Sequence, residues 1–455
     1  MPTLDEIVAL CKRRGFIYPG SDIYGGITGF WDYGPLGVEL KRNLKNEWWK
    51  TMVQLRSDVV GLDAAIIMNP DAWVASGHTK AFVDPLIECE VCHKRYRPDK
   101  IEMVPVEQNG KVVGYQLPPG NFECPSGGHA LKIIVKQVKE IDNTKIIEPW
   151  KFNLLVEAQL GVVEKQQVYL RGEITQGVFV NFRNVVDSTR IKIPFGIAQI
   201  GKAFRNEITP GNFIFRSREF EQMELEFFVK PDDAEGEKWF NYWQKQRKAW
   251  YVEFGIREEN LRLRDHRDDE RAHYARKATD IEYNAPFGWS EFEGIHHRGD
   301  WDLSRHKLIY TDPTTNETYT PWVIETSGGV DRAMLFFLLD AYRKEEKRIV
   351  LALDPRLSPV KVAIFPLVAN KSELVDKAKS IYDALRLSYV VAWDDRGNIG
   401  KRYLSQDEAG TPWCVTIDYD TLEDDTVTVR DRDTMTQERI AISKLPTYFQ
   451  EKLSE

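Results

Sequence analysis

The amino-acid sequence predicts a multidomain protein of the α/β and α+β classes. Two strand-like runs in residues 201–228 flank a loop that contains Pro210 and Gly211, and this pattern predicts an antiparallel hairpin in the main domain. Strand and helix patterns alternate after Asp354-Pro355, which predicts a smaller α/β domain with much parallel pairing. A length of 455 residues, of which 42% are hydrophobic, is sufficient for two or three domains with their own cores. We therefore divide the chain into residues 1–88, 89–150, 151–354 and 355–455.

The composition of the chain argues against a membrane protein, a secreted protein and a disulfide-rich protein. No stretch of 18 apolar residues occurs, and the N-terminus MPTLDEIVALCKRRGF lacks the apolar run of a signal peptide, so we expect a cytoplasmic enzyme without a membrane partner. The net charge of −8 argues only modestly against nucleic-acid binding, because an RNA footprint needs only a local basic face. Five cysteines, three of them grouped, do not suggest a disulfide framework.

Residues 33–56 predict a long helix that begins near Pro35, a residue suited to the first helical turn. Its apolar residues recur four apart and form one stripe: Leu36, Leu40, Leu44, Trp48 and Met52. Such a stripe can pack against the helix's own domain or against a second copy of the chain. The periodicity alone does not separate these alternatives.

The segment 89–150 predicts a small β-rich insertion with a zinc site. Cys89 and Cys92 form a Cys-x₂-Cys pair, and Cys124 with His129 forms a Cys-x₄-His pair. These four side chains can supply tetrahedral zinc ligands. His93 competes as the fourth ligand, and a metal-free insertion with buried thiols is the alternative.

The hairpin at 201–228 is the most informative segment of the chain. Period-two alternation places Arg205 and Glu207 on one face of its first strand. In the second strand, Phe220, Gln222, Glu224 and Glu226 share one face, and Met223, Leu225 and Phe227 share the opposite one. We expect one face to pack into a core and the other to offer cations, carboxylates and an aromatic ring. A surface hairpin held by salt bridges is the alternative.

A second ligand-binding segment is predicted at 323–338. A β-like run ends at Ser327-Gly328-Gly329, and an apolar helix pattern begins near Val330. Paired glycines let a backbone approach a ligand closely, and the free N–H groups of a helix start suit a phosphate. Arg332 lies in the first turn, where a cation is unfavourable to the helix dipole, so a phosphate partner is the better reason for it.

Residues 230–285 predict a helical insertion within the main domain. Trp239, Trp243, Trp250 and Phe254 follow helical spacing, which is typical of a core face. The charge cluster at 262–273 fits a solvated face better than a nucleic-acid contact, and we assign no chemistry to it.

The last hundred residues predict strands at 361–366, 390–393 and 413–417, with helices at 371–387 and from about 397 onward. Lys401, Arg402 and Tyr403 stand at the start of the second helix. They are candidate contacts for a nucleic acid, with a merely solvated basic turn as the alternative.

These segments together carry a resemblance that covers nearly the whole chain. Residues 201–228, GKAFRNEITPGNFIFRSREFEQMELEFF, resemble motif 2 of class II aminoacyl-tRNA synthetases. Residues 323–338 resemble motif 3 of these enzymes, and residues 33–56 resemble motif 1. In detail the sequence is similar to the dimeric bacterial family specific for glycine. The His-Ile-Gly-His and Lys-Met-Ser-Lys-Ser elements of class I synthetases and the phosphate loop Gly-x₄-Gly-Lys are absent.

The resemblance implies an antiparallel-sheet catalytic domain, a β-rich insertion and a C-terminal α/β anticodon-binding domain. It further implies an enzyme that activates glycine with ATP to glycyl-adenylate and then transfers glycine to the 3′ end of its tRNA. Such adenylate formation depends mainly on positioning and charge neutralisation.

For ATP, the resemblance implies that Arg205 holds the α-phosphate and Glu207 accepts from the adenine amino group. Arg216 would clamp the far phosphates, with Phe220 on one face of adenine and Arg332 on the other. The implied set is Arg205, Asn206, Glu207, Phe215, Arg216, Ser217, Arg218, Glu219, Phe220, Glu291, Phe292, Gly329, Val330, Asp331 and Arg332. Glu291 is expected to act through Mg²⁺, which one or two carboxylates and phosphate oxygens can hold.

For glycine, the resemblance implies that Glu173, Glu224 and Glu325 surround the ammonium group and that Ser327 closes the space beyond the α-carbon. The implied set is Arg97, Glu173, Phe220, Glu221, Gln222, Met223, Glu224, Glu325, Thr326, Ser327, Gly328 and Gly329. Three residues depart from the family pattern, namely Gly172 for a proline, Ile174 for a threonine and Thr326 for a proline. These departures reshape the backbone near the amine site and leave its charged groups intact.

The implied partners are ATP with Mg²⁺, glycine, the tRNA for glycine and a second copy of the chain. The homodimer would form through the helix that begins at Pro35. Two other functions are weighed against this one. An inactive, nucleic-acid-binding accessory subunit disagrees with the retained arginines at 205, 216 and 332, and a synthetase for another small amino acid disagrees with the three glutamates.

Overall fold

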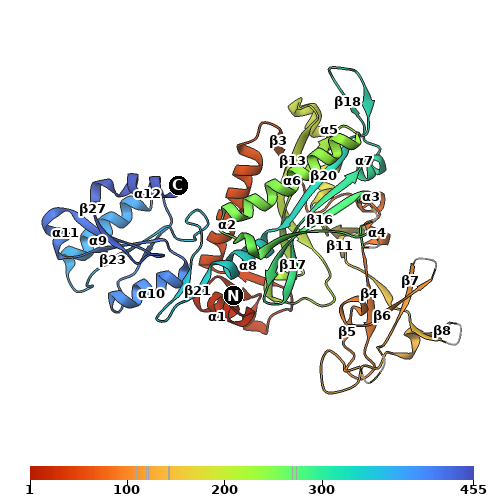
Figure 1. Cartoon of the computed structure of the whole chain (residues 1–455), viewed down its shortest axis with the longest axis horizontal. Coiled ribbons are helices and arrows are strands. Elements are labelled where there is room, and N and C mark those ends of the chain that lie inside the picture. The colour runs from red at the N-terminus through yellow and green to blue at the C-terminus, as the bar shows by residue number, and fades with distance from the viewer. Residues whose placement is uncertain are drawn as a thin grey trace.

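The computed structural model describes residues 1–454 except 109–110, 119, 121, 142–143, 269 and 273. A central sheet with its helices occupies the middle of the molecule, the β-rich insertion lies toward one end and the C-terminal domain lies at the other (Figure 1). In the described part of the chain, no helix combines the length and apolar character needed to cross a lipid bilayer.

The main domain is built on a seven-stranded sheet of order β15-β16-β17-β20-β14-β13-β3. Neighbouring strands are antiparallel except β13 and β3, which are parallel. The strands are β3 (Val59–Gly61), β13 (Phe195–Phe204), β14 (Glu219–Val229), β15 (Leu261–Asp265), β16 (Lys277–Ala285), β17 (Gly288–Gly299) and β20 (Trp322–Gly329). The antiparallel sheet predicted for this domain is therefore confirmed.

The predicted hairpin is formed by β13 and β14, with Phe204 opposite Glu219. Strand β13 ends at Phe204, so Arg205 and Glu207 lie just beyond it, yet both line the same pocket, in agreement with their predicted shared face. The N–H of Asn206 turns away from β14 and donates to the carbonyl of Leu154 at 2.8 Å, so both side chains belong to a loop. The alternation predicted for β14 is confirmed, since its odd-numbered residues from 223 to 229 are buried in the main core.

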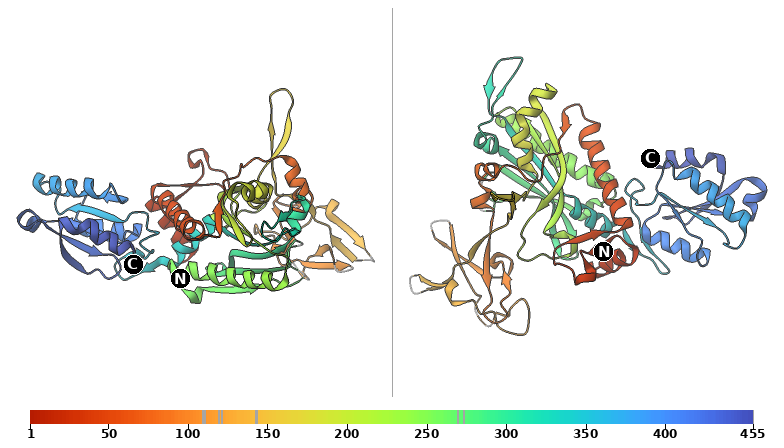
Figure 2. Two further views of the ribbon diagram at one scale, coloured as in Figure 1. Left: turned by 90° about the horizontal axis from the view of Figure 1, so that it is seen from above. Right: turned by 180° about the vertical axis from the view of Figure 1, so that it is seen from behind.

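Helices cover the two faces of this sheet unequally (Figure 2). The helices of the larger layer are α1 (Leu4–Arg14), α2 (Pro35–Trp49), α6 (Asp233–Glu253) and α8 (Val330–Ala341). On the opposite face, α5 (Thr175–Thr189) packs with Phe195, Ile197 and Phe228. Because Phe228 shares its face with Glu224, α5 covers one end of that face and leaves the other end open.

The apolar stripe of helix α2 packs mainly within its own domain, which was one of the two alternatives left open by the sequence. Leu40, Leu44, Trp48 and Met52 are all buried in the core of their own domain, and Leu36 is half-buried against it. A π-helical turn, Lys50–Gln54, continues the helix. Gly37 packs against the preceding segment so closely that a Cβ there would lie 1.8 Å from the carbonyl oxygen of Phe16. The stripe is explained by packing within the domain.

The helical insertion predicted at about 230–285 is only partly helical. Helix α6 ends at Glu253, and most residues of β16 are buried on both faces of the sheet. Trp243 and Trp250 are buried as predicted, whereas Trp239 is half-buried. This segment is therefore an integral part of the main domain, because it supplies two of the seven strands.

The segment between β3 and β13 contains the predicted β-rich insertion. Its sheets have the orders β10-β4-β5 and β6-β7-β9-β8. The strands are β4 (Val83–Glu88), β5 (Arg95–Tyr96), β6 (Val104–Gln108), β7 (Lys111–Gln116), β8 (Val138–Ile141), β9 (Thr144–Ile147) and β10 (Trp150–Asn153). The short helices α3 (Pro70–Ala75) and α4 (His78–Ala81) precede it, and the hairpin of β11 (Val156–Leu160) and β12 (Gln166–Leu170) follows it.

The C-terminal domain confirms the predicted strand and helix alternation. Its sheet has the order β24-β23-β25-β26-β27, in which β23 is parallel to both neighbours. The elements are β23 (Val362–Pro366), α9 (Ser372–Leu385), β24 (Val391–Trp393), α10 (Ile399–Ala409), β25 (Trp413–Ile417), α11 (Tyr419–Asp424), β26 (Thr426–Asp431), β27 (Gln437–Ala441) and α12 (Leu445–Ser454).

Two of the three candidate nucleic-acid contacts in this domain have internal partners instead. Arg402 is buried and donates to the carbonyl oxygens of Pro366 and Gly397 at 2.6 and 2.9 Å. The hydroxyl of Tyr403 lies 2.5 Å from that of Thr416. Only Lys401 is exposed, because one side of α10 faces the sheet.

Shorter elements complete the described chain. They are β1 (Ile17–Pro19), β2 (Trp31–Tyr33), α7 (Trp301–Arg305), β18 (Tyr310–Thr311), β19 (Thr318–Tyr319), β21 (Tyr342–Lys344) and β22 (Ile349–Leu351).

Candidate active site

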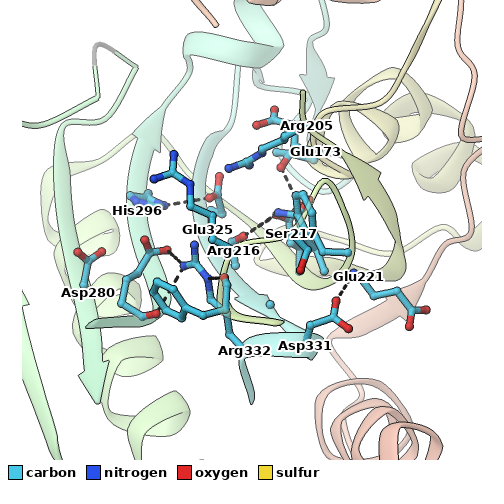
Figure 3. Close-up of a pocket in the computed structure, with 18 of the residues that line it drawn as sticks. Glu173, Arg205, Arg216, Ser217, Glu221, Asp280, His296, Glu325, Asp331 and Arg332 are labelled. Atoms are coloured by element: carbon cyan, nitrogen blue, oxygen red, sulfur yellow. Dashed lines mark hydrogen bonds and ion pairs between the residues drawn. The ribbon is translucent and has the colours of Figure 1, made fainter. Parts of the chain in front are cut away.

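A pocket of about 330 Å³ lies on the open end of the main sheet, where the first residue of α5, Thr175, reaches its lining. Its lining comes from β14, β16, β17 and β20, the starts of α5 and α8, the loop between β13 and β14, and the segment before β16. Glu173 and Arg205 lie together toward one end, and Arg332 lies at the other (Figure 3). Residues distant in sequence thus meet in one cavity.

Three carboxyl groups line one part of the pocket. Glu224 accepts hydrogen bonds from Thr175 Oγ1 at 2.7 Å, Gln222 Nε2 at 2.6 Å and Ser327 Oγ at 2.5 Å. Glu173 lies 3.1 Å from Nε2 of His78. Glu325 lies 2.9 Å from Nδ1 of His296 and is also paired with Arg298. Each carboxyl therefore has polar partners despite its burial.

The three groups differ in protonation. Burial and the nearby charges of Glu325 and Glu173 raise the pKa of Glu224 to about 8. Burial alone would raise the pKa of Glu173, but the neighbouring side chains of His78, Arg298 and Arg205 lower it below the ordinary value. Burial likewise opposes ionisation of Glu325, yet Arg298 and His296 lower its pKa. The site therefore combines two carboxylates with one carboxyl group that holds its proton more tightly.

Arg205 stands beside this cluster with its guanidinium between two aromatic rings. The ring centroids of Phe82 and Phe220 lie 5.3 and 5.2 Å from its central carbon. Its Nε donates to the carbonyl oxygen of Gly172 at 3.0 Å. Among the described residues, no hydrogen bond engages its Nη groups, so they are available to an anionic ligand.

Two further arginines are held by carboxylates of the same pocket. Nε of Arg216 donates to Glu207 at 2.7 Å. Arg332 pairs with Glu291 at 3.1 Å and lies over the ring of Phe215, 4.6 Å from its centroid. The ion pairs keep both guanidinium groups at the cavity wall, where a phosphate can exchange for a carboxylate.

Asp331 links three separate segments behind the pocket. Its carboxylate accepts from Lys41 of α2 at 2.7 Å, from the backbone N–H of Glu221 in β14 at 2.6 Å, and from the hydroxyl of Tyr33. One side chain at the start of α8 therefore joins β2, α2 and β14.

The predicted zinc ligands come together in the insertion. One ligand atom from each of Cys89, Cys92, Cys124 and His129 lies within 4.8 Å of the others. Cys89 Sγ lies 3.4 Å from His129 Nε2, and Cys92 Sγ lies 3.8 Å from Cys124 Sγ. His93 is largely exposed and lies 3.4 Å from Glu88, so it is not part of the group. Thiolate and imidazole donors in this arrangement suit Zn²⁺.

The sequence of this chain matches those of known proteins along nearly its whole length. A model of the tRNA synthetase class II core domain (G, H, P, S and T) matches residues 159–341, and one of an anticodon binding domain matches residues 361–452. The chain is 50% identical to the glycine–tRNA ligase of Streptomyces coelicolor, over 99% of this chain and 98% of the relative. It is 49% identical to those of Caldanaerobacter subterraneus and Thermobifida fusca, with the same coverage.

The chain belongs to the glycine–tRNA ligase family. The predicted fold class, enzyme class and family are thereby confirmed.

Most residues that the resemblance implied for this ligase lie in the pocket. Those in its lining are Glu173, Arg205, Glu207, Phe215, Arg216, Ser217, Phe220, Glu221, Gln222, Glu224, Glu291, Glu325, Ser327, Gly329, Asp331 and Arg332. These residues come from five separate segments of the chain. Because the fold brings all five to one pocket, their positions support the implied site more strongly than the sequence motifs do.

Nine implied residues do not line the pocket. Met223, Thr326, Phe292 and Val330 are buried on the core side of the sheet and helix α8. Gly328 also lies toward that side, where its nearest neighbours include Tyr251 and Met223. Because neighbouring strand residues face opposite ways, only their backbone groups can face a ligand.

The other four lie around the pocket. Glu219 pairs with Lys202, Arg218 donates to the carbonyl oxygen of Thr28 at 2.9 Å, and Asn206 begins the loop after β13. Arg97 pairs with Asp84, which lies 3.7 Å from Arg216. Arg97 is therefore connected to the lining residue Arg216 through Asp84.

Sequence patterns did not single out several side chains of the lining. These are Thr175, His266, Glu270, Tyr274, Asp280 and His296. The alternation of polar residues in β17 could have identified His296, which shares a face with Glu291 across the strand irregularity near Glu293. The charge cluster at 262–273 was expected to form a solvated face, but its residues His266 and Glu270 line the pocket, where only the tertiary fold places them.

Proposed function

We propose that the chain joins glycine to its tRNA through glycyl-adenylate, with both steps at the described pocket. The observation that carries this proposal is the position of Arg205 beside Glu173, Glu224 and Glu325. An amino acid bound there can place its ammonium group among carboxyl groups and its own carboxylate against a guanidinium. The same geometry explains how one end of the substrate is fixed while the other reacts.

In the activation step, a carboxylate oxygen of glycine attacks the α-phosphorus of ATP and pyrophosphate leaves. Arg205 is fixed by Gly172 and by two flanking rings, so its Nη groups can meet developing charge without reorganisation. Arg216 and Arg332 supply two further cations, and Phe220 and Phe215 supply aromatic faces near them. We assign adenine, the α-phosphate and the far phosphates to these residues as the resemblance implies.

Selection for glycine is assigned to Ser327. Its hydroxyl donates to Glu224 at 2.5 Å, so it lies against the carboxyl group proposed to bind the ammonium. A larger amino acid would have to displace a side chain that is held by this hydrogen bond. Overpacking a rigid site costs typically about 1–3 kcal/mol, which is enough to disfavour alanine.

The residues present fit a role for Mg²⁺. Glu291 lines the pocket next to Arg332, and Glu270 and Asp280 lie in the same lining. Carboxylate and phosphate oxygens are the ligands that Mg²⁺ prefers. Glu291 would hold the ion together with ATP, and the bound ion would neutralise phosphate charge.

We also propose a structural zinc ion in the insertion, held by Cys89, Cys92, Cys124 and His129. The ligand atoms are gathered, and Ser126 Oγ lies 3.2 Å from Cys124 Sγ. Elemental analysis of protein purified without chelator should find one zinc per chain, and Cys92→Ser should lose it. Metal-free wild-type protein that keeps its fold would contradict this assignment.

Three statements about organisation stay proposals. We assign residues 1–88 and 151–354 to the catalytic domain, 89–150 to the insertion and 355–455 to anticodon binding. We assign the protein to the cytoplasm. We propose a homodimer near α2, supported by Ile23, Tyr24, Ile27 and Val38, which are exposed apolar residues there.

Glycine-dependent exchange between ATP and pyrophosphate, measured without tRNA, tests the proposed function. We expect glycine to support exchange and alanine and serine to support far less. Equal exchange with alanine or serine would contradict glycine specificity. Absence of exchange with every amino acid would favour an inactive accessory subunit.

A further inference from the structure

His296 is a polar residue of the pocket that the proposed mechanism does not use. It stands on β17, directly opposite Glu325 in β20, and it lines the same cavity. Its Nδ1 lies 2.9 Å from Oε1 of Glu325, as Figure 3 shows. Neither the resemblance nor the relatives' names assign a role to this histidine. One of its ring nitrogens is thus engaged by a residue of the proposed ammonium site.

The second ring nitrogen of His296, Nε2, is available to a ligand. Among the residues that the structure describes, none makes a hydrogen bond or ion pair with it, and the side chain is 15% exposed in the lining of the pocket. The ring lies over Gly294, where a Cβ would be 2.6 Å from Cε1 and 3.2 Å from Nε2 of the histidine. A residue without a side chain at position 294 therefore lets the ring lie along the sheet.

The register of the sheet shows where Nε2 of His296 lies within the pocket. Gly294, which the ring covers, is opposite Ser327 in β20 and opposite Asp280 in β16. Both of these neighbours line the pocket. Nε2 therefore lies between Ser327, on the side proposed for glycine, and Asp280, on the other side of β17.

The two protein groups nearest to this position already have partners. Ser327 donates to Glu224 at 2.5 Å. Asp280 accepts from Nη2 of Arg264 at 3.0 Å and lies 2.8 Å from Nε2 of His266. The unengaged ring nitrogen on β17 is therefore left for a bound substrate.

The charges around His296 suit an anionic substrate group. Burial and the nearby Arg298 would lower the pKa of His296, but Glu325 and Asp280 raise it above the ordinary value. An imidazolium whose Nδ1–H points to a carboxylate presents its Nε2–H to the cavity. Such an N–H group makes a charge-assisted hydrogen bond with a phosphate oxygen.

The phosphate within reach is the one that becomes joined to glycine. Glu325 is proposed to bind the ammonium group, and only the α-carbon, the carbonyl carbon and one oxygen separate the amine from the α-phosphorus in glycyl-adenylate. A donor beside Glu325 therefore lies near the α-phosphate. Strands β20 and β14 lie between β17 and β13 in the sheet, so His296 approaches this phosphate from the side opposite Arg205.

We propose that His296 is a further catalytic residue, whose Nε2 donates a hydrogen bond to an oxygen of the α-phosphate, and that Gly294 provides the space for its ring. In the activation step a carboxylate oxygen of glycine bonds to the α-phosphorus. The bond from that phosphorus to the bridging oxygen of pyrophosphate breaks, and pyrophosphate leaves with the electron pair. His296 keeps its proton throughout and stabilises charge on the phosphate oxygens in the transition state. This inference rests on the proposed function.

The binding part is tested in the full-length enzyme with AMP, adenosine and pyrophosphate as probes. In His296→Ala, isothermal titration calorimetry should show AMP binding that is weaker by about 10–10²-fold, the range for one lost hydrogen bond to a charged group. Binding of adenosine and of pyrophosphate should not change. His93→Ala, at an exposed histidine of the insertion, is the matched control and should alter none of the three. Equal weakening of AMP and adenosine, unchanged AMP binding, or a loss confined to pyrophosphate would overturn the contact with the α-phosphate.

Gly294 gives a second test that keeps the imidazole. Gly294→Ala places a methyl group where the ring lies, so it should lower the single-turnover rate of adenylate formation by about 10²-fold, as should His296→Ala. The double variant should lose no more than either single variant, because both changes remove the same contact. Circular dichroism verifies that each variant is folded.

Two results would overturn the catalytic role. Additive losses in the double variant would show that the two residues act separately. A rise in the KM for glycine with an unchanged rate at saturating glycine would show that His296 only positions Glu325. Absence of glycine-dependent exchange in the wild type would instead overturn the proposed function, and the AMP and adenosine titrations would still decide whether His296 contacts the phosphate.

Discussion

Glu224 shows how single residues determine the behaviour of the site. Its pKa of about 8 lies above the ordinary value of 4.5 because the group is buried next to Glu325 and Glu173. Below pH 8 the free enzyme therefore holds a proton that an incoming ammonium group must displace. Glycine binding should tighten as the pH rises from 6 to 8, by at most about tenfold per unit.

The pH dependence of the KM for glycine in pyrophosphate exchange checks this expectation. Glu224→Gln should raise the KM and reduce its slope with pH, because no proton is displaced at that position. His296 also has a raised pKa and faces Glu325, so a residual slope in the variant is expected. An unchanged slope in Glu224→Gln would assign the titration elsewhere.

Arg205 provides a second prediction at this scale. In Arg205→Ala, adenylate formation should fall by about 10²–10³-fold, because a donor aimed at developing charge is lost. Arg183→Ala on the surface of α5 is the matched arginine control and should retain normal rates. Single-turnover adenylation measures both variants, and circular dichroism verifies that they are folded. A near-normal rate in folded Arg205→Ala would remove this residue from the mechanism.

At the scale of the element, α2 presents two faces with separable effects. Leu44 is fully buried, so Leu44→Ala should cost about 2–5 kcal/mol of stability, measured by urea unfolding. Val38 is exposed on the same helix, so Val38→Ala should change stability by less than about 0.5 kcal/mol. A third variant, Val38→Asp, places a charge on the exposed face of the helix. Light scattering should show weaker dimerisation in this variant and not in Val38→Ala. If Leu44→Ala were neutral, the packing assigned to this helix would be wrong.

At the scale of the whole molecule, the C-terminal domain lies apart from the pocket and is joined by polar contacts. Arg14 pairs with Glu408 at 2.5 Å, and Arg348 pairs with Asp407 at 3.0 Å. Among the residues that the structure describes, none beyond position 332 lines the pocket. Deletion of residues 356–455 should therefore leave glycine-dependent exchange largely intact and reduce tRNA charging by orders of magnitude.

Two point variants refine this prediction within the intact chain. Lys401→Ala should weaken tRNA binding without loss of stability, because Lys401 is exposed. Arg402→Ala should destabilise the domain, since Arg402 is buried and bonds backbone carbonyls. Gel-shift titration and thermal unfolding distinguish the two. Normal charging by the truncated enzyme would show that this domain is not the anticodon reader.

The sequence predicted burial correctly where the periodicity of a single strand or helix decides which side chains face the core. Alternation in residues 219–229 correctly assigned Met223, Leu225 and Phe227 to the core, because a strand's side chains face opposite ways whatever surrounds it. Arg205 and Glu207 lie beyond the end of β13 at Phe204, although both line the pocket as the alternation predicted. The helical pattern of 233–253 was correct, but it gave no indication that Lys277–Ala285 is a strand of the same sheet.

The sequence by itself determined the family, the main motifs, the zinc-ligand group and the residue types that the reaction needs. These follow from spacing along the chain and from side-chain chemistry, which do not depend on the path of the backbone. Only the tertiary structure decided which apolar stripe is internal, which basic residues are structural, and that His296 lies beside Glu325 and over Gly294. Burial, electrostatic coupling and contact between distant segments arise only when the chain is folded, because each depends on neighbours that the local sequence does not specify.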